Sequence, residues 1–424
     1  MLRDIDGSSR DVREWRVLMV LVFLALVGLS TRLLFVAYRA RILTTIDSPL
    51  LYQAGTLGFN YVDFGFVRRG LAGSIVHLIG GDRLVATSAF HILSAVLVAG
   101  AACGLLARRP LRRATAGVFI LLFAALVGRW TEDAGRTDML VATLLVLAVV
   151  MLTSARPVWA CVAVGIGLFV HETALIFGIP LLVALSLNDA RWRHFTTAQW
   201  IGVAAVLASA LVLYAAFPVL PHADLATIVS TVQSRLPPKE HVDWAIYYAV
   251  SGWRGVNTSI CQNAGDPTYV RHVLSGLLII VLFVIILRQH RPPRRRLVLL
   301  ASIPSYLFLC VIANDFSRWT VLAAFNVWLI AVSVLRTDEA SGLRFTGLHV
   351  ASAAAMIALL SPWTATVRYP IYVPSPAIDW YFERFGAAAT LPVSAALERC
   401  DPTWQEVLAG SLRSPVDRPR PLKP

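Results

Sequence analysis

The chain has 424 residues, of which 57% are hydrophobic and only 15% are charged, and its mean hydropathy is +0.67. A water-soluble protein of this length needs more charge to cover its surface, so the composition excludes an ordinary soluble enzyme. The formal net charge of +13 does not indicate nucleic-acid binding, because many arginines lie in short segments between apolar runs, where positive residues orient membrane proteins.

Apolar runs recur along the chain and predict an all-α, polytopic transmembrane helical bundle over residues 1–361. A helix needs roughly 20 residues to cross a hydrocarbon core, and on that basis we expect about eleven spans. In chain order the expected spans are 16–38, 84–107, 114–128, 139–152, 158–187 (two short spans), 200–219, 270–287, 298–313, 319–335 and 343–360. The polar segments 39–83 and 220–269 become outer loops, and residues 362–424 become an extracytoplasmic tail.

Two stretches differ from simple spans. The apolar piece Leu71–Ile79 is too short to cross, so we expect a short re-entrant or interfacial helix there. The run 158–187 is interrupted only by His171 and Glu172. We interpret it as two short spans that meet at this pair, because the arginine-bearing loop 188–195 is cytoplasmic only if the run crosses twice.

Two arginine clusters, at 108–113 and 288–296, fix the predicted orientation. Arginines in short loops favour the cytoplasmic side, and the spans between the two clusters alternate without conflict. We therefore expect a bacterial inner-membrane protein with a cytoplasmic N-terminus and an extracytoplasmic C-terminus. The ionisable residues at span ends then gather on the outer side. Charges at a membrane edge are costly and usually face a wet cavity or a partner, so we expect a site there.

The first outer cluster is the segment Asp63–Gly73, in which Arg68 and Arg69 are adjacent and flanked by glycines at the start of the short apolar helix. Guanidinium groups bind phosphate oxygens in pairs. A helix N-terminus adds unpaired amides and the positive end of the helix dipole. This pattern favours phosphate binding by Arg68 and Arg69. The alternative is that both side chains extend to lipid headgroups at the interface.

The second outer cluster is the hairpin Glu132–Asp138, which includes Arg136. Its carboxylates suit a sugar substrate, a base or a hard divalent cation such as Mg²⁺. The spacing matches no defined metal motif, and a solvated turn with an ion pair to Arg136 explains it equally well.

Two further clusters lie at predicted outer span ends. His171 and Glu172 suit general acid–base chemistry, although a lone histidine is more often a core residue. Asp315 and Arg318 are three residues apart, a spacing that suits an ion pair on one helix. Arg318 equally suits a second contact to phosphate.

The five cysteines fall into two groups. Cys103, Cys161 and Cys310 lie in apolar runs, where we expect small core residues. Cys261 and Cys400 both lie in predicted outer segments. Because that compartment is oxidising, a disulfide between them is a hypothesis.

This pattern resembles the bacterial polytopic membrane glycosyltransferases of the C-type fold and the exopolysaccharide or O-antigen polymerases. The resemblance covers the whole chain in architecture but in sequence only the short motifs Asp63–Gly73, Gly135–Asp138, His171-Glu172 and Asp315–Trp319. In C-type glycosyltransferases an acidic residue of the first outer loop often serves as base, so the resemblance implies this role for Asp63 or Asp47. The paired acids of some members are absent, since Ser48 follows Asp47 and Phe64 follows Asp63.

The resemblance implies that a sugar is transferred from a polyprenyl-phosphate or polyprenyl-pyrophosphate donor to a glycan or lipid acceptor at the outer face. The implied site has Asp63, Asp47, His171 and Glu172 as catalytic groups, Arg68, Arg69 and Arg318 at phosphate, and Arg136, Asp138 and Asp315 near the substrate or acceptor. Membrane lipid, a polyprenyl-linked sugar and the acceptor are the expected partners, and a divalent cation is the one cofactor considered. The alternatives are a transporter or flippase for a lipid-linked or anionic substrate, and a non-catalytic envelope protein.

Overall fold

The computed structural model describes residues 49–108, 119–120, 122–124, 126–127, 130, 135–188, 196–216, 225–236, 253–265, 269–287, 302–313, 316–334 and 400. Within these residues every regular element is a helix. The predicted all-α class is therefore confirmed for the described part of the chain.

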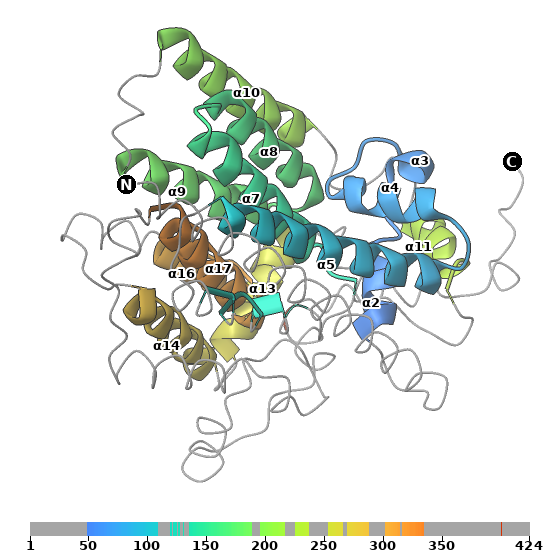
Figure 1. The fold of residues 1–424 in the computed structure, drawn as a ribbon. Coiled ribbons are helices and arrows are strands. Elements are labelled where there is room, and N and C mark those ends of the chain that lie inside the picture. Colours follow the sequence, from blue (N-terminus) through green and yellow to red (C-terminus); the bar gives the residue numbers. More distant parts are fainter. Residues whose placement is uncertain are drawn as a thin grey trace, which may run out of the picture.

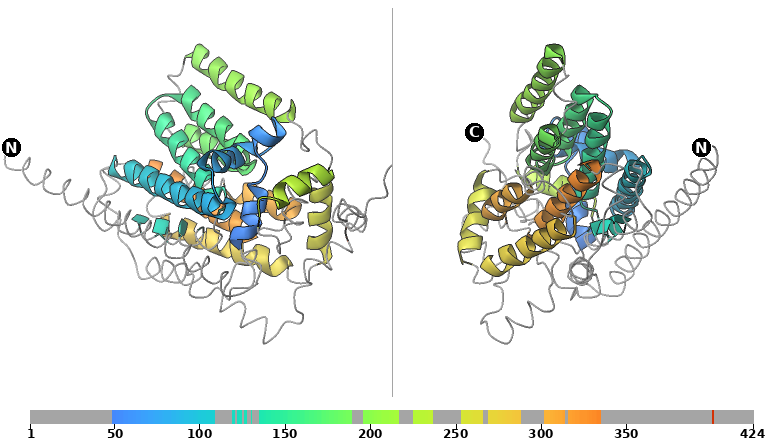
Figure 2. Two further views of the ribbon diagram at one scale, coloured as in Figure 1. Left: turned by 90° about the vertical axis from the view of Figure 1, so that its right-hand side faces the viewer. Right: turned by 60° about the vertical axis from the view of Figure 1, so that its left-hand side comes forward.

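A row of four helices forms one layer of the molecule (Figure 1). In order across the row these are α5 (Arg83–Ala107), α7 (Asp138–Thr153), α8 (Pro157–Val170) and α10 (Thr197–Ala216). Each packs against the next. Among the described helices, α10 lies at one edge of the row in Figures 1 and 2.

A second group of helices packs against this row and contains many of the fully buried residues. It consists of α9 (Thr173–Asn188), α14 (Tyr269–Leu287), α16 (Ser302–Ile312) and α17 (Phe316–Val334). The central member is α17, which contacts α7, α9, α14 and α16. Its Trp328 is fully buried, and the indole N–H donates a hydrogen bond of 2.9 Å to a backbone carbonyl. The apolar residues of α17 therefore hold both layers together.

Four short helices gather near the N-terminal end of α5 (Figure 1). They are α2 (Pro49–Thr56), α3 (Tyr61–Phe64), α4 (Gly70–Ile79) and α11 (Leu225–Gln233). At about 1.5 Å per residue, α4 is roughly 15 Å long, about half the thickness of a hydrocarbon core. This confirms the short helix expected at Leu71–Ile79.

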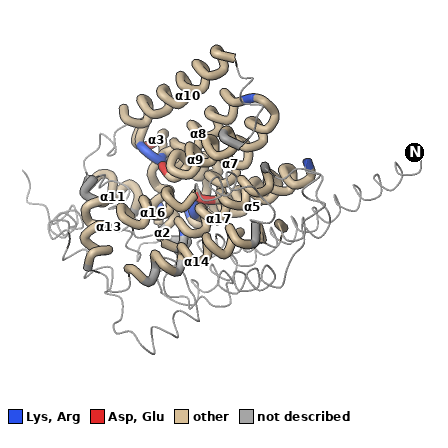
Figure 3. The backbone as a smooth tube through the Cα atoms, turned by 90° about the vertical axis from the view of Figure 1, so that its left-hand side faces the viewer, with Lys and Arg blue, Asp and Glu red and all other residues tan. Residues whose placement is uncertain are grey.

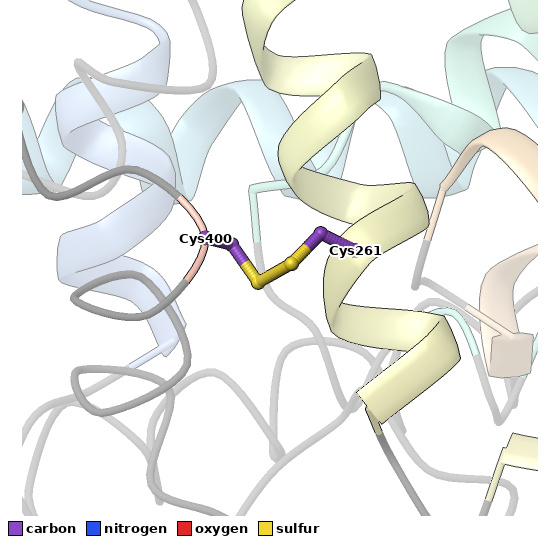
Figure 4. Close-up of a disulfide and its surroundings, with 2 residues drawn as sticks. All are labelled: Cys261 and Cys400. Atoms are coloured by element: carbon purple, nitrogen blue, oxygen red, sulfur yellow. A yellow bond between two sulfur atoms is a disulfide. The ribbon is translucent and has the colours of Figure 1, made fainter.

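A disulfide joins Cys261, in α13 (Trp253–Gly265), to Cys400. Figure 4 shows the bond between one turn of α13 and the segment that contains Cys400. The two residues are 139 positions apart in the sequence. The structure thus confirms the hypothesis that these two cysteines pair, and it leaves Cys103, Cys161 and Cys310 as free thiols.

Most of the expected spans correspond to helices. Helices α5, α7, α10, α14, α16 and α17 begin and end within four residues of the expected bounds. The predicted break at His171-Glu172 is confirmed, because α8 ends just before it and α9 begins just after it. Two of the described helices, α5 and α10, are long and apolar enough to cross a membrane. The total of about eleven spans stays a prediction, since 16–38, 343–360 and most of 114–128 lie outside the described residues.

Candidate functional site

The turn between α3 and α4 sets the positions of Arg68 and Arg69. The side-chain oxygen of Asn60 caps α3 by accepting two backbone N–H bonds of 2.9 Å. After α3 the chain turns through Gly65, which has a φ of 68°, and Arg69 itself has a φ of 60°. Holding a non-glycine residue in this left-handed region costs on the order of 1–3 kcal/mol, and such strain is concentrated at functional sites. The local backbone therefore fixes Arg69 at the N-cap position of α4.

Glu172 connects Arg69 to α10. Arg69 Nε donates a hydrogen bond to Glu172 Oε2 at 2.6 Å, and the Tyr214 hydroxyl donates to Glu172 Oε1. Burial raises the pKa of Glu172, but the charge of Arg69 and the hydrogen bonds from Tyr214 and Arg69 outweigh burial and hold that pKa below its usual value. Glu172 is therefore an ionised carboxylate that bridges two helices.

Arg68 lies on the same tyrosine. Its guanidinium carbon is 4.8 Å from the centre of the Tyr214 ring, a cation–π contact. Arg68 Nε is buried and has no hydrogen-bond partner among the described residues. A buried N–H of this kind is usually met by water or a ligand. Tyr214 thus contacts both arginines: its ring packs against Arg68, and its hydroxyl binds the Glu172 carboxylate that in turn binds Arg69.

His171 lies between α8 and α9, beside Glu172, and is buried. Its Nδ1 accepts a hydrogen bond from the Thr173 backbone N–H at 3.2 Å, which places the ring proton on Nε2. Burial lowers the pKa of His171 well below its ordinary value, and the charges of Arg318, Arg69 and Arg136 lower it further. His171 is therefore neutral, and three arginines act on it from different segments of the chain.

Asp138 and Arg318 form the buried part of the cluster. Arg318 Nε donates to Asp138 Oδ1 at 2.6 Å, and the two side chains are 12% and 2% exposed, Arg318 first. Asp138 begins α7, where the helix dipole favours a negative charge. Arg318, on the first turn of α17, also lies 4.8 Å from the centre of the Trp319 ring. This pair joins the two helix layers at the site.

Asp63 belongs to a different set of contacts. Arg235, just after α11, binds both of its carboxylate oxygens, with Nη2 2.8 Å from Oδ1. Asn60 Nδ2 donates to Oδ2 at 2.5 Å, and His77 Nδ1 lies 3.8 Å from the same oxygen. The hydrogen bond from Arg235 is the largest cause that lowers the pKa of Asp63 to about 2. Asp63 is therefore fully ionised and already occupied by protein partners.

Most of the charged residues named above adjoin one another, whereas Arg108 and Arg156 lie at other helix ends. Figure 3 shows red and blue segments adjoining near the labels of α3 and α17, while α9 and α10 are tan along most of their length. The structure brings together most of the predicted site residues: Arg68, Arg69, Arg136, Asp138, His171, Glu172 and Arg318. Asp47 and Asp315 lie outside the described residues.

Two residues of this region, Tyr214 and Arg235, were not predicted from the sequence as site residues. Tyr214 lies in the last turn of the apolar helix α10, where an aromatic residue is expected as a membrane-interface anchor. Arg235 lies in the long outer segment among other polar residues, and nothing in its local sequence indicates a partner 172 positions away. Among the residues that the structure describes, no three histidine, cysteine or acidic side chains are placed to hold a metal ion.

Comparison with known protein families identifies one that matches this chain. The model of glycosyltransferase family 87 matches residues 70–313, which include Arg136, Asp138, His171, Glu172 and Tyr214. Neither the curated proteins nor the solved structures contain a match to this chain. Because the matched region covers more than half of the sequence and contains most of the charged cluster, we conclude that the chain belongs to glycosyltransferase family 87.

Proposed function

We propose that this glycosyltransferase takes its sugar from a polyprenyl-phosphate or polyprenyl-pyrophosphate donor and transfers it to a glycan or lipid acceptor at the outer face of the bacterial inner membrane. The observation that carries the proposal is the convergence of arginines on His171 and Glu172. Within the described cluster, Arg68, Arg69, Arg136 and Arg318 accompany only two carboxylates, those of Glu172 and Asp138. The excess of positive charge suits an anionic donor.

Transfer breaks the bond between the sugar carbon and the phosphate oxygen, and the leaving polyprenyl phosphate gains negative charge. Fixed cations near that oxygen stabilise the transition state more than the ground state, because the charge develops only as the bond breaks. Arg68 and Arg69, held in advance by Tyr214 and Glu172, are the groups we assign to this role. Arg318, anchored by Asp138, is assigned to the same phosphate.

A base must accept the proton of the acceptor hydroxyl as the new bond forms. Of the two acids implied by the resemblance, Asp63 has both oxygens bound by Arg235, and a carboxylate with a pKa near 2 is a weak base. We therefore assign the proton to Asp47, which precedes α2 by two positions in the sequence. Asp63 then serves to fix the first outer loop to the segment that carries Arg235.

The outer location is supported by two independent features. The arginine clusters at 108–113 and 288–296 favour the cytoplasmic side by the positive-inside rule. The Cys261–Cys400 disulfide is typical of an oxidising, extracytoplasmic compartment. Because Asp63 pairs with Arg235, and both Arg235 and Cys261 belong to the segment 220–269, the first outer loop belongs to the same side.

The decisive experiment starts from a deletion strain. We expect it to accumulate a lipid-linked sugar, and we expect the purified full-length protein to convert that lipid to a glycosylated acceptor in vitro. Arg69→Ala and Asp47→Asn should each lower the rate of conversion strongly, Asp47→Asn by about 10²–10⁴-fold, while the protein level stays normal. Arg108→Ala removes an exposed arginine at the C-terminal end of α5 and should leave conversion unchanged. If the purified protein moves the lipid between leaflets without forming product, the chain is a transporter and the proposal fails.

A further inference from the structure

Tyr214 makes two contacts of different kinds at the centre of the arginine cluster. It lies in the last turn of α10, a helix whose other side chains are largely apolar and exposed. Its hydroxyl donates to Glu172 Oε1, and its ring lies under the guanidinium of Arg68 at 4.8 Å. α10 thus reaches the charged cluster through this one polar side chain.

Each contact controls a different arginine. Glu172 offers its second oxygen, Oε2, to Arg69 Nε at 2.6 Å, so the Tyr214 hydroxyl acts on Arg69 through the carboxylate. The ring acts on Arg68 directly, because a stacked guanidinium keeps its N–H groups in the plane and directed outward from the ring. One residue therefore orients two arginines that are adjacent in the sequence.

We propose that Tyr214 is a positioning residue that holds Arg68 and Arg69 in the arrangement that binds the donor's phosphate. The inference rests on the proposed function, since it assumes that both arginines contact phosphate. Arginine side chains have many rotamers, and immobilising them during binding weakens affinity. A pair that is already stacked and hydrogen-bonded avoids this loss. The phosphate site is then complete only when α10 packs beside α8.

Two substitutions separate the contacts. Tyr214→Phe removes the hydroxyl and keeps the ring, whereas Tyr214→Leu removes both. With the purified full-length protein, the probe is farnesyl phosphate, a short-chain polyprenyl monophosphate, and farnesol serves as the phosphate-free control. We expect Tyr214→Phe to bind farnesyl phosphate about tenfold more weakly, the size set by one hydrogen bond to a charged group. Tyr214→Leu should bind more weakly still, and farnesol binding should not change in either variant.

Leu213→Ala is the matched control, because Leu213 is the preceding residue of α10 and is half exposed. It should bind farnesyl phosphate like the wild type. Thermal unfolding of each variant shows whether the helices remain packed. Equal binding by wild type, Tyr214→Phe and Tyr214→Leu would overturn the inference about Tyr214.

Double-variant cycles distinguish positioning from general structural support. Tyr214→Phe should be coupled to Arg69→Ala, since both act through Glu172, and should be additive with Arg68→Ala, since the ring is retained. Tyr214→Leu should be coupled to Arg68→Ala. Loss of affinity without this pattern would also overturn the inference. A wild type that does not distinguish farnesyl phosphate from farnesol would instead refute the proposed phosphate site, independently of Tyr214.

Discussion

Breaking the ion pair between Asp63 and Arg235 tests whether Asp63 or Asp47 accepts the proton of the acceptor hydroxyl. The pKa of Asp63 is lowered from 3.8 to about 2, which corresponds to about 2 kcal/mol of stabilisation at neutral pH. Because the pKa is lowered in the folded state, this contribution is complete above pH 3.8 and is lost as the pH falls towards about 2. Asp63→Asn and Arg235→Gln each remove the same interaction, so the double variant should be little less stable than either single variant.

The rate of sugar transfer distinguishes Asp47 from Asp63 as the base more clearly than stability does. If Asp63 only fixes the loop, Asp63→Asn and Arg235→Gln should lower the rate of sugar transfer by similar factors. Asp47→Asn should lower it by about 10²–10⁴-fold, the usual contribution of a positioned base. The assay is the conversion of the accumulated lipid-linked sugar by purified protein, with the unfolding midpoint of each variant measured in parallel.

The opposite pattern would refute this reasoning. Arg235→Gln frees the carboxylate of Asp63 and lets its pKa return towards the ordinary value, which would make it a better base. If Arg235→Gln keeps or gains activity while Asp63→Asn loses it, Asp63 is the base and Asp47 is not. Arg108→Gln, which removes an exposed arginine from the far end of α5, is the matched control and should behave like the wild type.

Three other outcomes are expected from the buried and covalent contacts. Arg318→Ala leaves the buried Asp138 carboxylate unpaired and should lower the free energy of unfolding by about 3–5 kcal/mol. Adding Asp138→Asn should recover part of this loss of stability. An unchanged unfolding midpoint in Arg318→Ala would contradict the expectation. Because the pKa of buried His171 is lowered in the folded state, stability should fall below about pH 6.5 by up to about 1.4 kcal/mol per pH unit, and His171→Gln should flatten that slope between pH 7 and 5.5. Cys261→Ser should expose Cys400 to a polyethylene-glycol maleimide without reductant, whereas the denatured, unreduced wild type should react only at its three free cysteines.

The helices were largely predictable from the sequence because a single physical rule sets them. An apolar run must form a helix in a hydrocarbon environment, since no water is present to satisfy backbone N–H and C=O groups. This rule places the ends of α5, α7 and α14 within one residue of their expected positions. It also locates the break at His171-Glu172, because a polar pair inside such a run is costly.

The partners of the charges could not be predicted in the same way. Arg69, Arg235 and Arg318 each pair with an acid that lies between 103 and 180 positions away. Such a pairing depends on which helices pack together, and the hydrophobic pattern does not specify the neighbours of a span. Charged residues in an apolar sequence therefore identify candidate site residues, whereas their pairing requires the three-dimensional structure.

The contacts nevertheless bear on the orientation that the sequence predicts. Glu172 lies just after α8, and Asp138 begins α7. Tyr214 lies in the last turn of α10 and Arg318 in the first turn of α17, and the predicted alternation of spans assigns all four of these helix ends to the outer side. The alternative, a single long span across 158–187, would place Glu172 in the middle of the membrane and reverse the direction of α10. Glu172 would then lie half a membrane away from the end of α10, yet it accepts a hydrogen bond from Tyr214 there. The hydrogen bond between Tyr214 and Glu172 therefore favours the interpretation of 158–187 as two short spans, and the proposed outer location of the site depends on that interpretation.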